Sequence, residues 1–355
     1  MDRRLLFAAV ALALSPGIVR AAESSPWSAT PTAQIVAEDK TFRNGEASLS
    51  GTLYLPRDTA PVAAIVVAHG ASSPLRAAPL YRHLVEMLPP LGVAVFVYDR
   101  RGSGASARAA NTGDYTALAD DAIAAARMLK ADRRIDPKRV GVWGLSQGGW
   151  LSLLAASRSK DIGFAVSISA PVVTPDVQMI FFSANTLRVN GYPQAEIDQM
   201  IAARKAVDDY MRGTNTIEDA QAKVDGIRGK PWFKYLYMGE KVRDRAVSGW
   251  RKEIEHDPLK TLEAVRVPTL VIYGAADPVV PVSISVDRLR AVLPAHPEMT
   301  LAVVAGADHS MQMGVDPKVQ LDPEQADAGA PDAPEYFGLL ASWLTRAGIA
   351  RPPRR

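Results

Sequence analysis

One pentapeptide, Gly-Leu-Ser-Gln-Gly at residues 144–148, limits the folds open to this chain more than any other feature. The apolar run 140–143 precedes it and the helix-like segment 150–157 follows it. A serine between two glycines, where a strand turns sharply into a helix, is the pattern of a nucleophile elbow. Strain at such a turn aims the hydroxyl out of the sheet. Taken alone, the pattern also fits a glycine-rich turn without chemistry; in this context it predicts that Ser146 is a nucleophile.

Strand-like and helix-like segments alternate through most of the chain. The strands are continuous apolar runs, typical of strands buried on both faces. We expect strands at 62–68, 93–98, 139–143, 164–168, 269–273 and 300–304, and helices at 80–88, 116–131, 282–293 and 335–346. This alternation predicts an α/β fold with a mostly parallel central sheet wrapped by helices. An Asn-Gly pair between 38–43 and 47–55 predicts a leading antiparallel hairpin.

Residues 172–260 break this rhythm, because they are far too many for a connection between adjacent strands. Helical patterns occur at 194–212 and 217–227. We therefore expect an inserted helical cap at 172–260, on an α/β core formed by 34–171 and 261–350. Most aromatic side chains of the cap are expected to pack it onto the core, and some could wall an apolar acyl pocket: Trp232, Phe233, Tyr235, Tyr237 and Trp250.

The first 21 residues have the layout of a bacterial secretion signal. Two arginines at positions 3 and 4 precede an apolar run at 5–14, and small residues follow near the expected cleavage position. The run is too short to span a membrane stably. We expect removal of 1–21 and a periplasmic or secreted protein without stable membrane insertion. The alternative is an N-terminal membrane anchor, and the paired arginines fit twin-arginine export only in part.

Charge and cysteine content narrow the chemistry. The net charge of +3 becomes +1 once 1–21 is removed, so nucleic acid and anionic lipid are not expected partners. The chain has no cysteine, which excludes disulfides, thiolate metal ligands and a cysteine nucleophile. The five histidines lack metal-site spacing, and the glycine-rich segment 101–106 lacks the Lys-Ser/Thr of a phosphate loop. We therefore expect no metal and no cofactor.

A serine hydroxyl needs a base, usually a histidine supported by a carboxylate. His309 follows the strand expected at 300–304, at the start of a long surface loop expected over 306–334. Asp277 follows the strand expected at 269–273 and lies between serine and histidine in the chain order of this fold. Asp308 is the second choice for the acid, because a sequence neighbour reaches the inner ring nitrogen with difficulty.

The four other histidines are assigned no catalytic role. We expect His69 and His83 to be structural, and we expect His256 and His296 to be solvated.

The oxyanion of an acyl-transfer intermediate needs two hydrogen-bond donors. One is expected to be the backbone N–H of Gln147, directly after the serine. The other is expected from the loop after the strand at 62–68, which begins with His69 and Gly70. Gly70 permits close backbone approach, and the N–H of Ala71 is the expected donor.

These motifs together resemble the α/β-hydrolase superfamily, from about residue 38 to the last helix. Gly51 to Pro56, His69-Gly70 and the segment Asp99-Arg100-Arg101-Gly102-Ser103-Gly104-Ala105-Ser106 carry the resemblance beside the elbow, Asp277 and His309. Within the superfamily, the chain looks like bacterial secreted esterases related to the serine-aminopeptidase-like and acyl-thioester-hydrolase-like branches. Asp99 and Arg100 mainly shape the turn beside the site in such proteins. Some relatives carry Glu at position 147.

The sequence thus predicts a serine hydrolase that cleaves carboxylic esters of small acyl substrates through an acyl-enzyme. A thioesterase or a small-peptide hydrolase with the same residues stays open. An aminopeptidase needs acidic groups for a free amine, which the cap could supply from Glu218, Asp219, Asp225, Glu240, Asp244, Glu253 and Glu255. A binding protein that has lost turnover on the same fold is the remaining alternative. The acyl group and the oligomeric state are left undecided.

Overall fold

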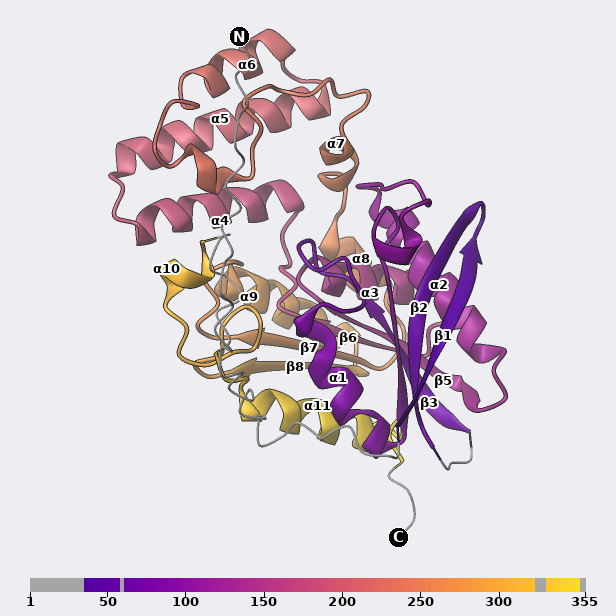
Figure 1. Cartoon of the computed structure of the whole chain (residues 1–355). Helices are drawn as coiled ribbons and strands as arrows, with labels where there is room; N and C mark the ends of the chain where they lie inside the picture. The colour runs from indigo at the N-terminus through magenta and orange to yellow at the C-terminus, as the bar shows by residue number, and fades with distance from the viewer. Residues whose placement is uncertain (1–34, 58–60, 323–329, 352–355) are drawn as a thin grey trace, which may run out of the picture.

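An eight-stranded β-sheet runs through the computed structural model, which describes residues 35–57, 61–322 and 330–351 (Figure 1). The strands are β1 (Ile35–Asn44), β2 (Ala47–Pro56), β3 (Val62–Ala68), β4 (Val93–Tyr98), β5 (Ile135–Leu145), β6 (Phe164–Ile168), β7 (Thr269–Gly274) and β8 (Met299–Val304). Their order is β1-β2-β4-β3-β5-β6-β7-β8. The β1–β2 and β2–β4 pairs are antiparallel and all other neighbours are parallel. The signal peptide expected at 1–21 lies outside the described residues and stays a prediction.

Helices cover both faces of this sheet. One face buries its side chains under α2 (Tyr115–Lys130), α3 (Gln147–Arg158), α8 (Pro258–Ala264) and α9 (Val282–Val292). The other face packs against α1 (Arg82–Met87) and α11 (Pro334–Arg346) (Figure 1). The predicted α/β fold with a mostly parallel sheet is confirmed. None of the described helices is both long and apolar enough to cross a bilayer.

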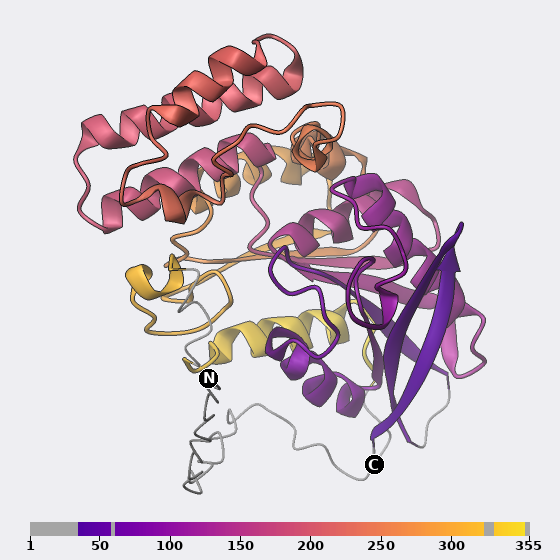
Figure 2. The ribbon, with the colours of Figure 1, turned by 45° about the horizontal axis from the view of Figure 1, so that its top comes forward.

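Between β6 and β7 the chain forms a helical insertion, made of α4 (Pro175–Val189), α5 (Gln194–Arg212), α6 (Ile217–Asp225) and α7 (Gly249–Glu253). Figure 2 shows α4, α5 and α6 stacked beyond one edge of the sheet. The insertion has two small apolar cores of its own, centred on Trp232 and on Tyr210. Trp232, Phe233 and Tyr235 pack into the first core, so they hold the insertion together; Tyr237 is 64% exposed.

The segment 306–334 differs from the long surface loop expected there. Its described residues include α10 (Pro317–Gln320) and two short bridges, Ala307 to Met313 and Gln312 to Asp332. Backbone hydrogen bonds tie the segment to itself, among them Ala333 N to Met311 O at 2.7 Å. Met311 is 1% exposed and belongs to the same apolar cluster as the buried side chains of α11, which anchors the segment to that face of the sheet.

Close contact between the turn at the end of β5 and the start of α3 requires glycine at position 144. A Cβ on Gly144 would lie 1.9 Å from the carbonyl oxygen of Gly148, far inside contact distance. We expect Gly144→Ala to lower the free energy of unfolding by about 3 kcal/mol, because backbone must move to relieve the overlap. Denaturant unfolding measures this change.

Gly338→Ala is the matched control. Gly338 is exposed in the middle of α11, and a Cβ there would meet nothing within 4 Å. Alanine favours a helix interior, so this variant should gain about 0.5–1 kcal/mol. Equal effects at the two positions would contradict the steric account.

Candidate active site

Three predicted site residues, Ser146, Asp277 and His309, follow strands β5, β7 and β8. β6 lies between β5 and β7, and all these neighbours pair in parallel. Their carboxyl ends therefore share one edge of the sheet. Backbone hydrogen bonds join the loops at that edge, from Ser146 N to Ile168 O at 2.8 Å and from Ala276 N to Ala307 O at 2.9 Å.

Ser146 has a strained backbone, with φ of 57° and ψ of −122°. A non-glycine residue in such a conformation costs about 1–3 kcal/mol, which the surrounding structure must offset. Ser146 occupies the N-cap position of α3, yet its side chain accepts no capping hydrogen bond from the helix. The hydroxyl is thus not engaged by the helix, and the helix N-terminus beside it favours negative charge.

His309 and Asp277 form a hydrogen-bonded pair, with 2.8 Å between His309 Nδ1 and Asp277 Oδ2. The other carboxylate oxygen of Asp277 accepts from the N–H groups of Val279 and Val280, at 2.7 and 3.1 Å. These bonds fix the carboxylate. Because an ionised carboxylate only accepts, Nδ1 carries the proton and Nε2 is left as the basic nitrogen of the neutral ring.

The ring of His309 is more basic than usual. Burial by itself lowers the pKa of His309, but the charge of Asp277, the hydrogen bond to it and the charge of Asp308 together raise the pKa above its ordinary value of 6.5. Asp277 therefore both orients the ring and stabilises its protonated form. In the described part of the chain, no hydrogen bond joins Ser146 to His309.

Asp308, the second choice for the acid, does not bind the ring of its neighbour. Its Oδ1 accepts from the N–H groups of Ser310 and Gln312 at 2.9 and 2.8 Å, which closes the turn that carries His309. Burial raises the pKa of Asp308, and its other oxygen has no hydrogen-bond partner among the residues that the structure describes. The side chain shapes the loop.

Two of the other histidines lie where expected. His69 is buried, its Nε2 is hydrogen-bonded to Tyr98 O, and burial lowers its pKa to about 4. His83 lies between Leu80 O and the Tyr336 hydroxyl, each 2.9 Å from one ring nitrogen.

The expectation of a solvated His256 is wrong. The residue is 8% exposed, its ring packs against those of Tyr115 and Trp150, and burial lowers its pKa to about 4. The charged neighbours of His256 in the sequence suggest exposure, but the segment after α7 packs against α2 and α3 and buries the ring.

Gln147, whose N–H is the first expected oxyanion donor, begins α3 with its side chain buried. An N–H in the first turn of a helix has no partner within that helix. The side-chain amide is held at both ends: Arg100 Nη1 donates to Oε1 at 2.6 Å, and Nε2 donates to the Tyr115 hydroxyl at 3.1 Å. The sequence predicts mainly a turn-shaping role for Arg100 and gives no role to Tyr115, whose one signal is an aromatic side chain at a helix start.

Ala71, the second expected donor, lies exposed in the loop after β3. The Tyr81 hydroxyl braces this loop, because it accepts from Gly70 N at 3.3 Å and donates to Ser73 O at 2.6 Å. The loop is therefore held on both sides of Ala71.

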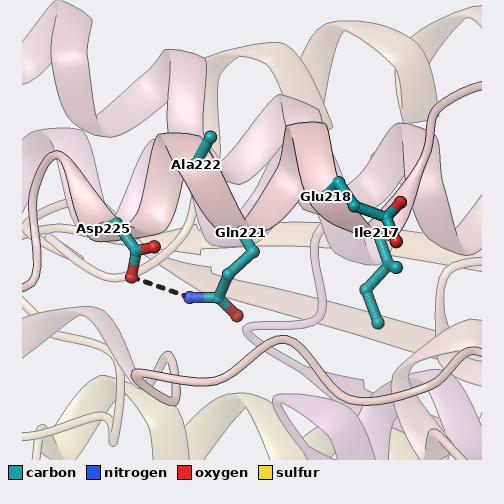
Figure 3. Close-up of a pocket in the computed structure, with 5 residues that line it drawn as sticks. All are labelled: Ile217, Glu218, Gln221, Ala222 and Asp225. Atoms are coloured by element: carbon teal, nitrogen blue, oxygen red, sulfur yellow. Dashed lines mark hydrogen bonds between the residues drawn. The ribbon is translucent and has the colours of Figure 1, made fainter.

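Two surface hollows lie elsewhere, on the helical insertion. One of about 360 Å³ lies along α6 and is lined by Ile217, Glu218, Gln221, Ala222 and Asp225 (Figure 3). Gln221 there is used structurally, because it donates to Asp225 and to Glu240 O at 3.0 and 2.9 Å. The other, of about 490 Å³, lies over residues 228–240. Neither is lined by Ser146, Asp277, His309, Gln147 or Ala71. Within the described ranges, no three His, Asp or Glu side chains converge to hold a metal ion.

Comparisons with known proteins agree with this arrangement of strands and loops. The sequence profile of the family described as serine aminopeptidase S33 matches residues 59–316. The chain is 24% identical over 274 residues to thiohydrolase aneE of Aspergillus aculeatus, which spans 72% of this chain and 83% of that protein. It is 26% identical over 223 residues to the AB hydrolase superfamily protein YisY of Bacillus subtilis, covering 60% and 75%.

The fold is similar to that of a solved esterase, Pf2001 of Pyrococcus furiosus. The TM-score is 0.54 with 18% identity, over 88% of this chain and 90% of that one. At this identity the likeness establishes the shared α/β-hydrolase fold.

The charge of Asp277 should set the basicity of His309. We expect an imidazole NMR titration to give His309 a pKa above 6.5, and Asp277→Asn to bring it below that value, since burial then dominates. Asp308→Asn, which removes a smaller contribution, should lower the pKa less. A His309 pKa unchanged in Asp277→Asn would contradict the assigned pair.

Proposed function

Because this chain belongs to the serine aminopeptidase S33 family of α/β hydrolases, we propose that it cleaves carboxylic esters through Ser146, His309 and Asp277. One observation carries the proposal. The 2.8 Å hydrogen bond between His309 Nδ1 and Asp277 Oδ2 lies at the sheet edge where the strained Ser146 follows β5. This is the set of groups that acyl transfer to a serine requires.

The proposed reaction has two halves. Ser146 Oγ attacks the ester carbonyl carbon while His309 Nε2 accepts the hydroxyl proton, and the backbone N–H groups of Gln147 and Ala71 bind the oxyanion. Collapse of the intermediate breaks the bond to the alcohol, which takes the proton from His309. Water, deprotonated by the same nitrogen, then attacks the acyl-enzyme; the bond to Ser146 Oγ breaks, His309 returns the proton to that oxygen, and the acid leaves.

Thioesters are the second candidate substrate, because one relative is named a thiohydrolase. The same groups would serve, with a thiol as leaving group.

Peptide hydrolysis from a free amino end is less well supported. It needs a carboxylate beside the site, and most of the cap acids weighed for that role are exposed: Glu218, Asp219, Asp225, Glu240, Asp244 and Glu255. Glu253 is partly buried, but its carboxylate accepts from the Tyr115 hydroxyl at 3.4 Å. These positions therefore favour an ester over an aminoacyl substrate.

Ser146→Ala and His309→Ala should each lower kcat for p-nitrophenyl butyrate by on the order of 10⁴-fold or more, while the protein stays folded. Asp277→Asn should be similarly impaired, because the ring loses its orienting charge. Steady-state kinetics and thermal unfolding check this. A fluorophosphonate should label Ser146 in the wild-type protein; no adduct on folded protein would favour a binding protein instead.

Substrate class is tested by comparing three probes on the purified protein. We expect p-nitrophenyl butyrate and a butyryl thioester to be cleaved with a higher kcat/KM than an aminoacyl p-nitroanilide, because six of the seven cap acids are exposed and Glu253 is hydrogen-bonded to Tyr115. Preference for the anilide would overturn the ester assignment and favour aminopeptidase activity. A series of ester chain lengths would then define the acyl group.

A further inference from the structure

A single chain of hydrogen bonds runs from the elbow to the helical insertion. Arg100 Nη1 donates to Gln147 Oε1 at 2.6 Å, Gln147 Nε2 donates to the Tyr115 hydroxyl at 3.1 Å, and that hydroxyl donates to Glu253 Oε2 at 3.4 Å. A guanidinium only donates, so the amide oxygen must face Arg100 and its NH2 group must face Tyr115. Every bond in the chain has the same direction, and the side chain of Gln147 has one orientation.

Arg100 also holds the opposite side of the proposed oxyanion site. Its backbone N–H donates to Pro74 O at 2.8 Å, in the loop that carries Ala71. The preceding residue, Asp99, accepts from Arg76 N in the same loop at 2.9 Å. Arg100 thus connects the two segments that would supply the two oxyanion donors.

The insertion approaches the other end of the chain at the start of α2. A Cβ on Gly113 would lie 2.6 Å from Glu253 Oε1 and 2.9 Å from Gly249 O, so only glycine admits α7 at this distance. Asp114, the N-cap of α2, has Lys252 Nζ 3.4 Å from its Oδ2. The first turn of α2 therefore joins α7 to the core.

The middle of this chain of bonds, between Gln147 and Tyr115, is buried, and its two ends are partly buried. Tyr115 is 5% exposed, and its ring contacts those of Trp150 and His256. Burial raises the pKa of Glu253, while the charge of Arg100 and the Tyr115 hydrogen bond lower it. Hydrogen bonds in such surroundings are strong, and breaking one leaves a buried group unpaired.

We propose that Arg100, Tyr115 and Glu253 are positioning residues, which hold the Gln147 amide so that its backbone N–H meets the oxyanion. The inference rests on the proposed function of Ser146. Through Glu253, α7 of the insertion would then contribute to stabilising the transition state. This role is separate from any contact of the insertion with substrate. Such residues act on kcat, because the oxyanion forms after the substrate has bound.

Tyr115→Phe tests the proposal, because it removes only the hydroxyl between Gln147 and Glu253. With p-nitrophenyl butyrate we expect kcat to fall about tenfold and KM to stay within about twofold. Tyr210→Phe is the matched control: Tyr210 is also buried, and its hydroxyl accepts from Arg245 N at 3.2 Å inside the insertion. That variant should keep wild-type kcat.

Substitutions of Glu253, the partly buried last residue of α7, test the other end of the chain independently. Glu253→Leu should lower kcat, and Glu253→Gln, which keeps an acceptor for the Tyr115 hydroxyl, should restore most of it. Glu255→Leu, at an exposed position beside α7, should have no effect. The double variant Tyr115→Phe/Glu253→Leu should be no slower than Tyr115→Phe, because both break one chain.

Wild-type kcat in Tyr115→Phe, a change confined to KM, or losses that multiply in the double variant would overturn the positioning role. Ser146→Ala is measured in parallel. If it is inactive while Tyr115→Phe matches Tyr210→Phe, the positioning role alone fails. If Ser146→Ala still hydrolyses the ester, the proposed function is wrong, and the positioning role that rests on it is wrong as well.

Discussion

The parallel pairing of β3, β5, β6, β7 and β8 is the constraint on which the site depends. Because neighbouring strands run in one direction, the loops after them meet at one edge of the sheet. This pairing brings Asp277 and His309 to the same edge as Ser146, although they follow it by 131 and 163 positions in the chain. The backbone hydrogen bonds between these strands thus fix the starts of the loops that carry Ser146, Asp277 and His309.

Strain and burial complete the arrangement. The left-handed backbone of Ser146 is tolerated because β5 and α3 are fixed on either side of it. The basicity of His309 is maintained against burial by the charge of Asp277. Both effects require a well-packed surrounding, which the two apolar layers on the faces of the sheet supply.

Much of this could be predicted from sequence, and the reasons are specific. Strands at 62–68, 93–98 and 164–168 match their expected bounds, because a continuous apolar run between turn residues has few other solutions. α4 could not be assigned from pattern, since Met179 to Phe182 form an apolar run without helical periodicity. Likewise, His256 looks solvated beside its charged neighbours, and only tertiary packing buries it. The Arg100–Gln147 contact joins residues 47 positions apart and leaves no local signal.

The contact between Glu253 and Tyr115 has a consequence for how such proteins diversify. An insertion between β6 and β7 could in principle be replaced by another, to change which substrate binds, while the residues at the sheet edge stay the same. Here the insertion also supplies Glu253, which accepts a hydrogen bond from Tyr115 in a chain that reaches Gln147, the neighbour of Ser146. Replacing residues 172–260 would remove Glu253 and break that chain. A replacement insertion must therefore place a carboxylate or amide oxygen beside the Tyr115 hydroxyl.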